Sequence, residues 1–135
     1  MTKRESLRLL LMTVLMALGA SSAFADDARV EFAEFQNQGG GTWWVNVTLR
    51  HADTGWEHYA DAWRVVGPDG AELGKRVLYH PHENEQPFTR SLSGVKIPQG
   101  VTTVWVEAHD NVHGWNKTRL EVDLTKSSGP GFKVN

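Results

Sequence analysis

The sequence predicts an all-β protein in which two sheets pack as a β-sandwich. Short apolar segments alternate with a period of two residues, and clusters of Gly, Pro, Asn and Asp separate them at short intervals. No long segment shows the 3.6-residue period of an amphipathic helix. Residues 42–50 show the alternation most clearly. Their apolar side chains on one face are Trp43, Val45, Val47 and Leu49. Seven such segments are typical of an immunoglobulin-like seven-stranded β-sandwich.

We expect the first 25 residues to be a cleaved signal peptide rather than part of the sandwich. Lys3, Arg4 and Arg8 precede an apolar run, and Ala23-Phe24-Ala25 has the small-x-small pattern of a cleavage site. The mature chain would begin at Asp26, in the periplasm or outside the cell, with no membrane association after cleavage. Residues 26–125 would form one domain.

The composition of the mature chain restricts its partners. Without the first 25 residues the chain has 11 basic and 15 acidic residues, a formal net charge of −4. This balance argues against nucleic acid, which requires a basic surface. The chain has no cysteine, and its three methionines all lie in the signal segment. A metal ion would therefore have imidazole, carboxylate or backbone ligands, which disfavours Cu(I).

The expected strands follow one another along the chain with short turns between them. We expect them at residues 29–35, 42–50, 59–66, 73–79, 88–92, 101–108 and 117–124. Turn-forming residues fill 36–41, 67–70 and 93–100, and prolines limit the loop at 80–87. The Ser-, Gly- and Pro-rich residues 126–135 predict a flexible tail.

All six histidines occupy the loops expected at one end of the sandwich. Successive strands reverse direction, so the loops after the second, fourth and sixth strands share an end. These loops contain His51, His58, His80, His82, His109 and His113. The turns expected at the other end contain none. Histidine is the commonest metal ligand in proteins, so its collection at one end predicts a metal site.

The strand phase indicates which side chains point into the sandwich. His51 continues the inward phase of Val47 and Leu49, and Asp110 continues that of Ala108. An inward carboxylate is costly unless it is paired or bound to a metal. His109 precedes Asp110 directly, so the two side chains should point to opposite faces. A simpler interpretation is that Asp110 caps its own turn and that the histidines are solvated loop residues.

Two motifs resemble the iron-binding domain of the superoxide reductases, the desulfoferrodoxin and neelaredoxin family. His51-ADTGWE-His58-Tyr59 is similar to a family motif of two histidines separated by five residues and followed by Tyr-Ile, with one more spacer. Asp110-NVHGW resembles the family's C-N-x-H-G-x-W, one residue shorter before Trp115. The resemblance covers roughly residues 49–124. It implies an immunoglobulin-like sandwich and an iron centre, which in the family has four equatorial histidines and an axial cysteine.

The sequence departs from this family at three positions. Asp110 stands where the family has its axial cysteine, and the family's N-terminal histidine and lysine have no counterpart in residues 31–41. The resemblance therefore implies a metal site at His51, His58 and His113, without implying superoxide reductase activity. His80 or His82 would supply the missing imidazole in preference to His109. Asp110 would be an axial ligand or would support one.

We expect a periplasmic or secreted protein that binds one transition-metal ion in a His-rich site. The candidate ligands are His51, His58, His113, His82, His80 and Asp110. The resemblance favours iron, and zinc and copper are alternatives. One alternative function is a divergent superoxide-reductase-like non-haem iron redox enzyme. Another is a metal-free module that binds a ligand or a periplasmic protein partner through Trp56, Tyr59 and Trp115. The sequence does not choose among these, and it identifies neither the metal nor the oligomeric state.

Overall fold

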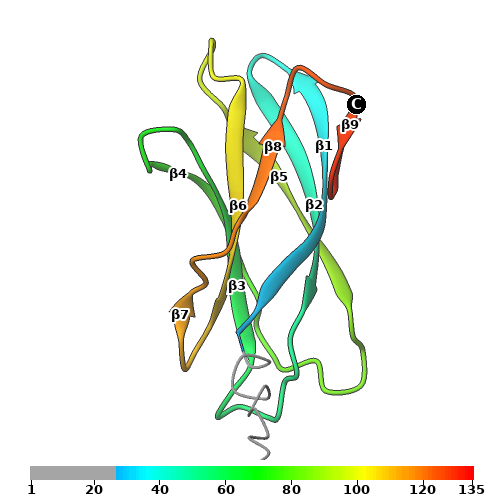
Figure 1. Cartoon of the computed structure of the whole chain (residues 1–135), viewed down its shortest axis with the longest axis vertical. Helices are drawn as coiled ribbons and strands as arrows, with labels where there is room; N and C mark the ends of the chain where they lie inside the picture. The colour runs from blue at the N-terminus through cyan, green and yellow to red at the C-terminus, as the bar shows by residue number, and fades with distance from the viewer. Residues whose placement is uncertain (1–26) are drawn as a thin grey trace, which may run out of the picture.

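The computed structural model describes residues 27–135, which form an all-β structure of two sheets (Figure 1). The described residues contain ten strands and no helix. In chain order the strands are β1 (Arg29–Gly39), β2 (Thr42–Arg50), β3 (Ala60–Val66), β4 (Glu72–Val77), β5 (Phe88–Lys96), β6 (Thr103–Asp110), β7 (Gly114–Trp115), β8 (Leu120–Asp123), β9 (Ser128–Gly129) and β10 (Phe132–Val134). The predicted signal peptide lies outside the described residues. Within residues 27–135, no helix is long and apolar enough to cross a membrane.

The chain passes repeatedly between the two sheets. One sheet has the order β5-β2-β1-β10-β9, and the other has β4-β3-β6-β7, with β8 also paired to β6. One edge of β6 pairs with β3. The opposite edge pairs with β7 near one end of β6 and with β8 further along it. The single strand predicted at residues 117–124 is therefore shorter, and a separate two-residue strand precedes it.

The C-terminal segment differs from the sequence prediction. We expected residues 126–135 to be flexible, but β9 and β10 extend the first sheet, and β10 runs parallel to β1. Phe132 is 5% exposed and belongs to the hydrophobic core. The backbone amide of Asn135 also donates a hydrogen bond to the carbonyl oxygen of Phe35 (2.8 Å). The apolar anchor Phe132 explains why this polar segment is ordered, and the structure has ten strands instead of seven.

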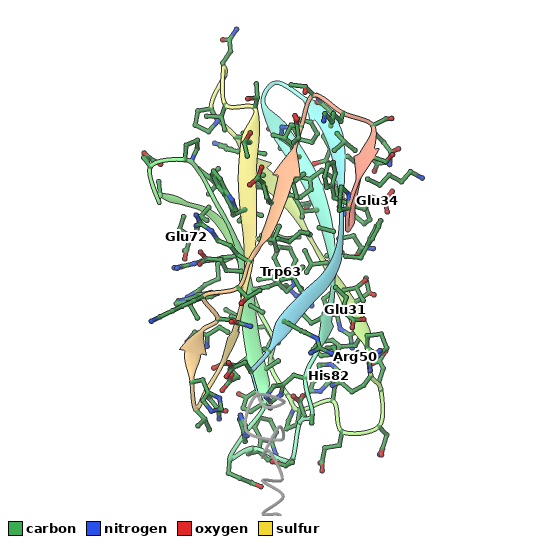
Figure 2. All side chains as sticks on the ribbon, in the orientation of Figure 1. Glu31, Glu34, Arg50, Trp63, Glu72 and His82 are labelled. Carbon is green, nitrogen blue, oxygen red and sulfur yellow. The ribbon has the colours of Figure 1, made fainter. Side chains whose placement is uncertain are left out.

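The core between the sheets consists of the inward side chains that the period-two pattern predicts. Trp63 lies between the sheets near the middle of the molecule (Figure 2). Val45, Val47 and Leu49 of β2 are fully buried, as their shared phase predicts. The described residues contain no cysteine, so the sandwich depends on this apolar core and on its strand hydrogen bonds.

The loops that carry the histidines lie at one end of the molecule. The β2–β3 loop, the β4–β5 loop and the β6–β7 connection all lie at the lower end of Figure 1. The β1–β2 and β5–β6 connections lie at the upper end. The alternation of strand directions thus brings the loops together as the sequence predicts. The positions of the individual side chains depend on how each loop folds.

Candidate metal centre

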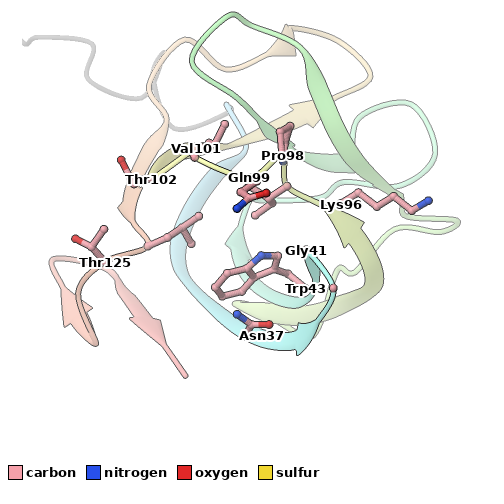
Figure 3. A pocket seen from close by; sticks show the side chains of 13 residues that line it. Asn37, Gly41, Trp43, Lys96, Pro98, Gln99, Val101, Thr102 and Thr125 are labelled. Carbon is pink, nitrogen blue, oxygen red and sulfur yellow. The ribbon is translucent and has the colours of Figure 1, made fainter.

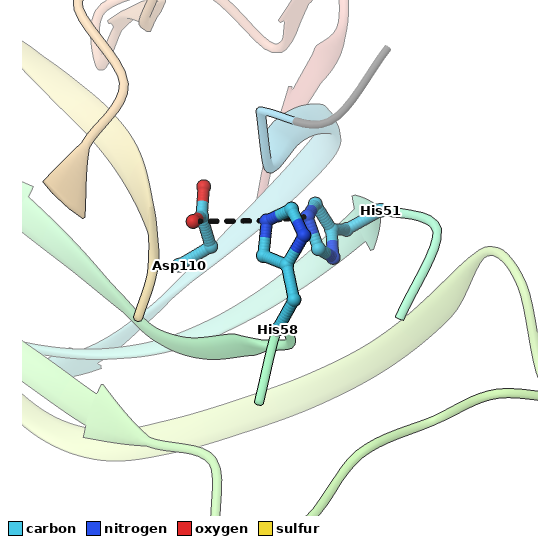
Figure 4. Close-up of side chains that lie close together, drawn as sticks. All are labelled: His51, His58 and Asp110. Atoms are coloured by element: carbon cyan, nitrogen blue, oxygen red, sulfur yellow. Dashed lines mark hydrogen bonds and ion pairs between the residues drawn. The ribbon is translucent and has the colours of Figure 1, made fainter. Parts of the chain in front are cut away.

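His51 and His58 face each other where the β2–β3 loop meets the core. His51 directly follows β2, keeps the inward phase of that strand and is 2% exposed. His58 lies two residues before β3. The two Nε2 atoms are 3.2 Å apart, and His58 Nε2 is 3.3 Å from Asp110 Oδ1 (Figure 4). The β2–β3 loop and the end of β6 therefore bring two imidazoles and one carboxylate together.

The spacing of these three atoms fits a bound cation. Ligand atoms held about 2.1 Å from one ion lie roughly 3.0 to 3.4 Å apart in octahedral or tetrahedral geometry. The observed 3.2 and 3.3 Å fall within that range. The carboxylate can only accept hydrogen bonds, and a neutral imidazole carries one proton. A cation between these electron-rich atoms would be attracted to all three.

Asp110 also holds the β6–β7 turn together. Its Oδ1 accepts hydrogen bonds from the backbone amides of Val112 (2.9 Å) and His113 (2.7 Å). Burial by itself would raise the pKa of Asp110. The amides of His113 and Val112, the charge of the His113 ring and the amide of Ala28 outweigh burial, so the pKa is lowered. Asp110 is therefore an ionised carboxylate that caps its own turn, as the simpler interpretation of the sequence proposed, and it also faces His58.

His113 extends the group towards the surface. Its Nδ1 lies 3.0 Å from Oδ1 and 3.2 Å from Oδ2 of Asp110, and 3.4 Å from Asp27 Oδ1. Asp27, Asp110 and His113 form a second set of converging ligand atoms that shares Asp110 with the first. The ring of His113 packs 5.1 Å from that of His58, and its side chain is 40% exposed. The site thus has a buried part at His51 and an accessible part at His113.

We expected His80 or His82 to supply a further imidazole, but both lie outside the group of His51, His58 and Asp110. His80 is exposed, and its Nδ1 lies 3.1 Å from the carbonyl oxygen of Pro81. His82 is buried and stacks on Phe88, where its Nε2 accepts a hydrogen bond from Arg90 (2.9 Å). Its Nδ1 finds no hydrogen-bond partner among the described residues. Arg90 and the contacts of the loop backbone hold His82 beside the group instead of within it.

His109 lies on the face opposite Asp110, as strand alternation predicts. Its Nδ1 is 2.5 Å from Asp61 Oδ1, and its ring contacts Trp115 edge-on. The guanidinium group of Arg64 stacks on the Trp115 ring, 3.9 Å from its centre. Trp115 therefore packs on the outer face of β6, and His109 is not a ligand of the group.

Asp53, which we did not expect at the site from the sequence, contacts His51 directly. The side chain of this residue is fully buried, and its Oδ1 is 2.5 Å from His51 Nδ1. It also accepts hydrogen bonds from the backbone amides of Ala60 and His82. Asp53 continues the inward phase of Leu49 and His51, and this phase is the signal that could have identified it.

One cavity lies beside the group of His51, His58 and Asp110, and a larger one lies at the opposite end of the sandwich. A cavity of about 400 Å³ lies beside His51, with Arg29, Arg50, Asp27 and Glu83 in its walls. A larger cavity of about 770 Å³ lies at the opposite end, over Trp43 and between the turns at Gly41 and Pro98 (Figure 3). Lys96 is its one ionisable lining residue. The smaller cavity therefore lies at the histidine end, next to His51 and Asp53.

Comparison with known proteins identifies two similar chains. No protein-family model matches the sequence. A protein of Halomicrobium mukohataei described as "Putative lipoprotein" is 40% identical over 97 residues, which make up 72% of this chain and 47% of that protein. The chain therefore spans about half the length of this curated relative. Among solved structures, a reduced superoxide reductase (neelaredoxin) variant from Archaeoglobus fulgidus is similar, with 12% identity and a TM-score of 0.42. The match covers 81% of this chain and 97% of that one, and it is too distant to bear on the site.

Proposed function

We propose that this chain is a metal-binding protein that holds one transition-metal ion between His51, His58 and Asp110. The observation that carries the proposal is the convergence of two imidazole nitrogens and a carboxylate oxygen at 3.2 and 3.3 Å. His113 would add a fourth ligand from the accessible side. A modest movement of its ring would suffice, because it already contacts both His58 and Asp110.

The donor set selects a class of metal. Two or three imidazoles with one carboxylate suit Fe(II), Zn(II), Cu(II) or Ni(II), and no thiolate or thioether is available for softer ions. The resemblance of the two sequence motifs to superoxide reductases favours iron among these. A carboxylate in place of the family's axial cysteine is a harder and weaker donor. We therefore assign binding of the ion, rather than superoxide reduction, as the function.

We place this function outside the cytoplasm. The basic start, apolar run and Ala-x-Ala pattern of residues 1–25 support export. The description of the relative as a lipoprotein is consistent with an exported or membrane-anchored protein. The absence of cysteine among residues 26–135 means that folding there needs no disulfide chemistry.

Elemental mass spectrometry of the purified, untagged protein tests the proposal. We expect close to one equivalent of metal per chain in the wild type. The variant His51→Ala/His58→Ala should lose it, because both buried imidazoles are removed. His80→Ala is the matched control, since His80 is an exposed histidine of the same end that contacts Pro81 and the ring of His82 and lies outside the group.

The identity of the metal decides between the proposed roles. Iron would make a redox role the next question, whereas zinc or copper would indicate storage or delivery. If the wild type contains no metal and takes up none on titration, the proposal is wrong. The histidine end would then be a docking surface for a ligand or a protein partner.

A further inference from the structure

Asp53 is a buried carboxylate whose partners come from three parts of the chain. Oδ1 is 2.5 Å from the ring nitrogen Nδ1 of His51 and accepts a hydrogen bond from the amide of Ala60 (3.0 Å) at the start of β3. Oδ2 accepts a hydrogen bond from the amide of His82 (2.7 Å) in the β4–β5 loop. The side chain is 0% exposed. A buried carboxylate is costly without such partners, and here three donors surround it.

We infer that Asp53 is a positioning residue that holds His51 in the form protonated at Nδ1 and thereby presents its Nε2 lone pair to the metal. This inference rests on the proposed function. A neutral imidazole carries its proton on one nitrogen, and a carboxylate at 2.5 Å from Nδ1 draws the proton there. The other nitrogen, Nε2, is the atom that faces His58.

Two consequences of this arrangement favour metal binding. The ring of His51 is fixed in orientation before the ion arrives, because Asp53 is itself anchored by the amides of Ala60 and His82. The carboxylate also makes the ring a stronger donor through its negative charge. Nε2 of His58 lies 3.2 Å from Nε2 of His51 and 3.3 Å from Asp110 Oδ1, so an ion bound there would meet all three atoms.

The competing interpretation is that Asp53 only connects the β2–β3 loop to the β4–β5 loop through its hydrogen bond with the His82 amide. Gln86 provides a matched control for it. Gln86 Oε1 accepts a hydrogen bond from the amide of His51 (2.9 Å), and its Nε2 donates to the carbonyl oxygen of His82 (2.9 Å). Gln86 thus joins two of the three segments that Asp53 joins, and its hydrogen bonds go to their backbone. If Asp53 only connected the His51 and His82 segments, loss of either residue should have a similar effect on zinc affinity.

The test has two readouts on the full mature chain. Long-range ¹H–¹⁵N correlation spectra of the ¹⁵N-histidine-labelled, metal-free protein report the tautomer of His51 at a pH where the ring is neutral. Calorimetric titration with Zn²⁺ reports affinity. We expect the wild type to show His51 protonated at Nδ1. Asp53→Ala should lose this single tautomer and bind zinc roughly 10- to 100-fold more weakly. Gln86→Ala should keep the tautomer and bind zinc within about threefold of the wild type.

Asp53→Asn distinguishes the acceptor from the loop contact. The side-chain oxygen of the introduced asparagine can replace Oδ1 of Asp53 as the acceptor for His51 and Ala60. The hydrogen bond from the His82 amide to Oδ2 would be lost. We expect this variant to keep the Nδ1 tautomer and most of the zinc affinity. A wild type protonated at Nε2 of His51 would overturn the inference even if Asp53→Ala does not fold. Equal losses of affinity in Asp53→Ala and Gln86→Ala would also overturn it. If the wild type binds no metal, the proposed function fails, and the tautomer still decides the role of Asp53.

Discussion

At the scale of single residues, Asp110 combines a turn cap with a candidate metal ligand, and substitutions can separate the two. Asp110→Ala leaves the amides of Val112 and His113 without their acceptor, which should lower the free energy of unfolding by about 1–3 kcal/mol. Asp110→Asn keeps an oxygen at this position and should lose less. Both variants should bind metal more weakly, because both lack the anionic oxygen. Urea unfolding and zinc titration measure the two effects. Equal stability of both variants would contradict the cap.

The ring of His82 should make the metal-free protein less stable in mild acid. Burial, the nearby positive charge of Arg90 and the charge of His80 lower the pKa of His82 from its ordinary value of 6.5. The unfolded chain therefore takes up this proton at a higher pH than the folded chain. The stability that neutral His82 provides is complete above about pH 6.5 and decreases as the pH falls towards the lowered pKa.

This pH dependence can be isolated with His82→Gln, which retains an acceptor for Arg90 but does not titrate. Urea unfolding from pH 8 to pH 5, with a chelator present, gives the stability difference between the two proteins. We expect the wild type to lose its stability advantage over His82→Gln progressively below pH 6.5. Parallel curves over the whole range would show that His82 titrates normally.

How far single residues can be predicted from the sequence depends on their distance from a strand. His51 and Asp110 terminate strands, so the alternation of side chains predicts that both point inward and that His109 points outward. Asp53 lies in a loop but keeps the inward phase of Leu49 and His51, so its direction could have been predicted by extending that phase. His82 lies in a loop with no such continuation, and its position follows from contacts with Asp53 and Arg90, which are distant in sequence. The sequence therefore predicts the core of the site but not its supporting contacts.

At the scale of elements, the C-terminal strands should contribute substantially to stability. Phe132 of β10 is 5% exposed, so Phe132→Ala should lower the free energy of unfolding by about 3–5 kcal/mol through lost burial and a cavity. The adjacent Lys133 is exposed and gives the control Lys133→Ala, which should change stability by less than about 0.5 kcal/mol. Chemical denaturation measures both. A Phe132→Ala variant as stable as the wild type would restore the prediction of a flexible tail.

The strands with a clear period were predictable, whereas the short strands at the edges were not. The predicted strand at residues 42–50 has the bounds of β2, and that at 59–66 differs from β3 by one residue. β9 and β10 have two and three residues, too few for any alternation to show. They form because β1 offers a free edge and Phe132 can enter the core. An immunoglobulin-like topology stays a prediction.

At the scale of the whole molecule, metal binding should stabilise the fold. The candidate ligands come from the β2–β3 loop and the end of β6, so an ion bound between them would connect both sheets. Zinc at one hundred times its dissociation constant should raise the free energy of unfolding by about 2.7 kcal/mol if it binds only the folded chain. Thermal unfolding with and without zinc measures this. His51→Ala/His58→Ala should show no zinc-dependent shift, and an equal shift in both proteins would point to another site.

Anomalous diffraction from crystals of the metal-loaded mature protein would locate the ion directly. We expect one strong peak about 2.0–2.2 Å from Nε2 of His51 and Nε2 of His58, at the end of the sandwich that carries all six histidines. Asp110 or His113 should complete the coordination. A peak at His80 or His109 alone, or no peak between His51 and His58, would contradict the proposed metal centre.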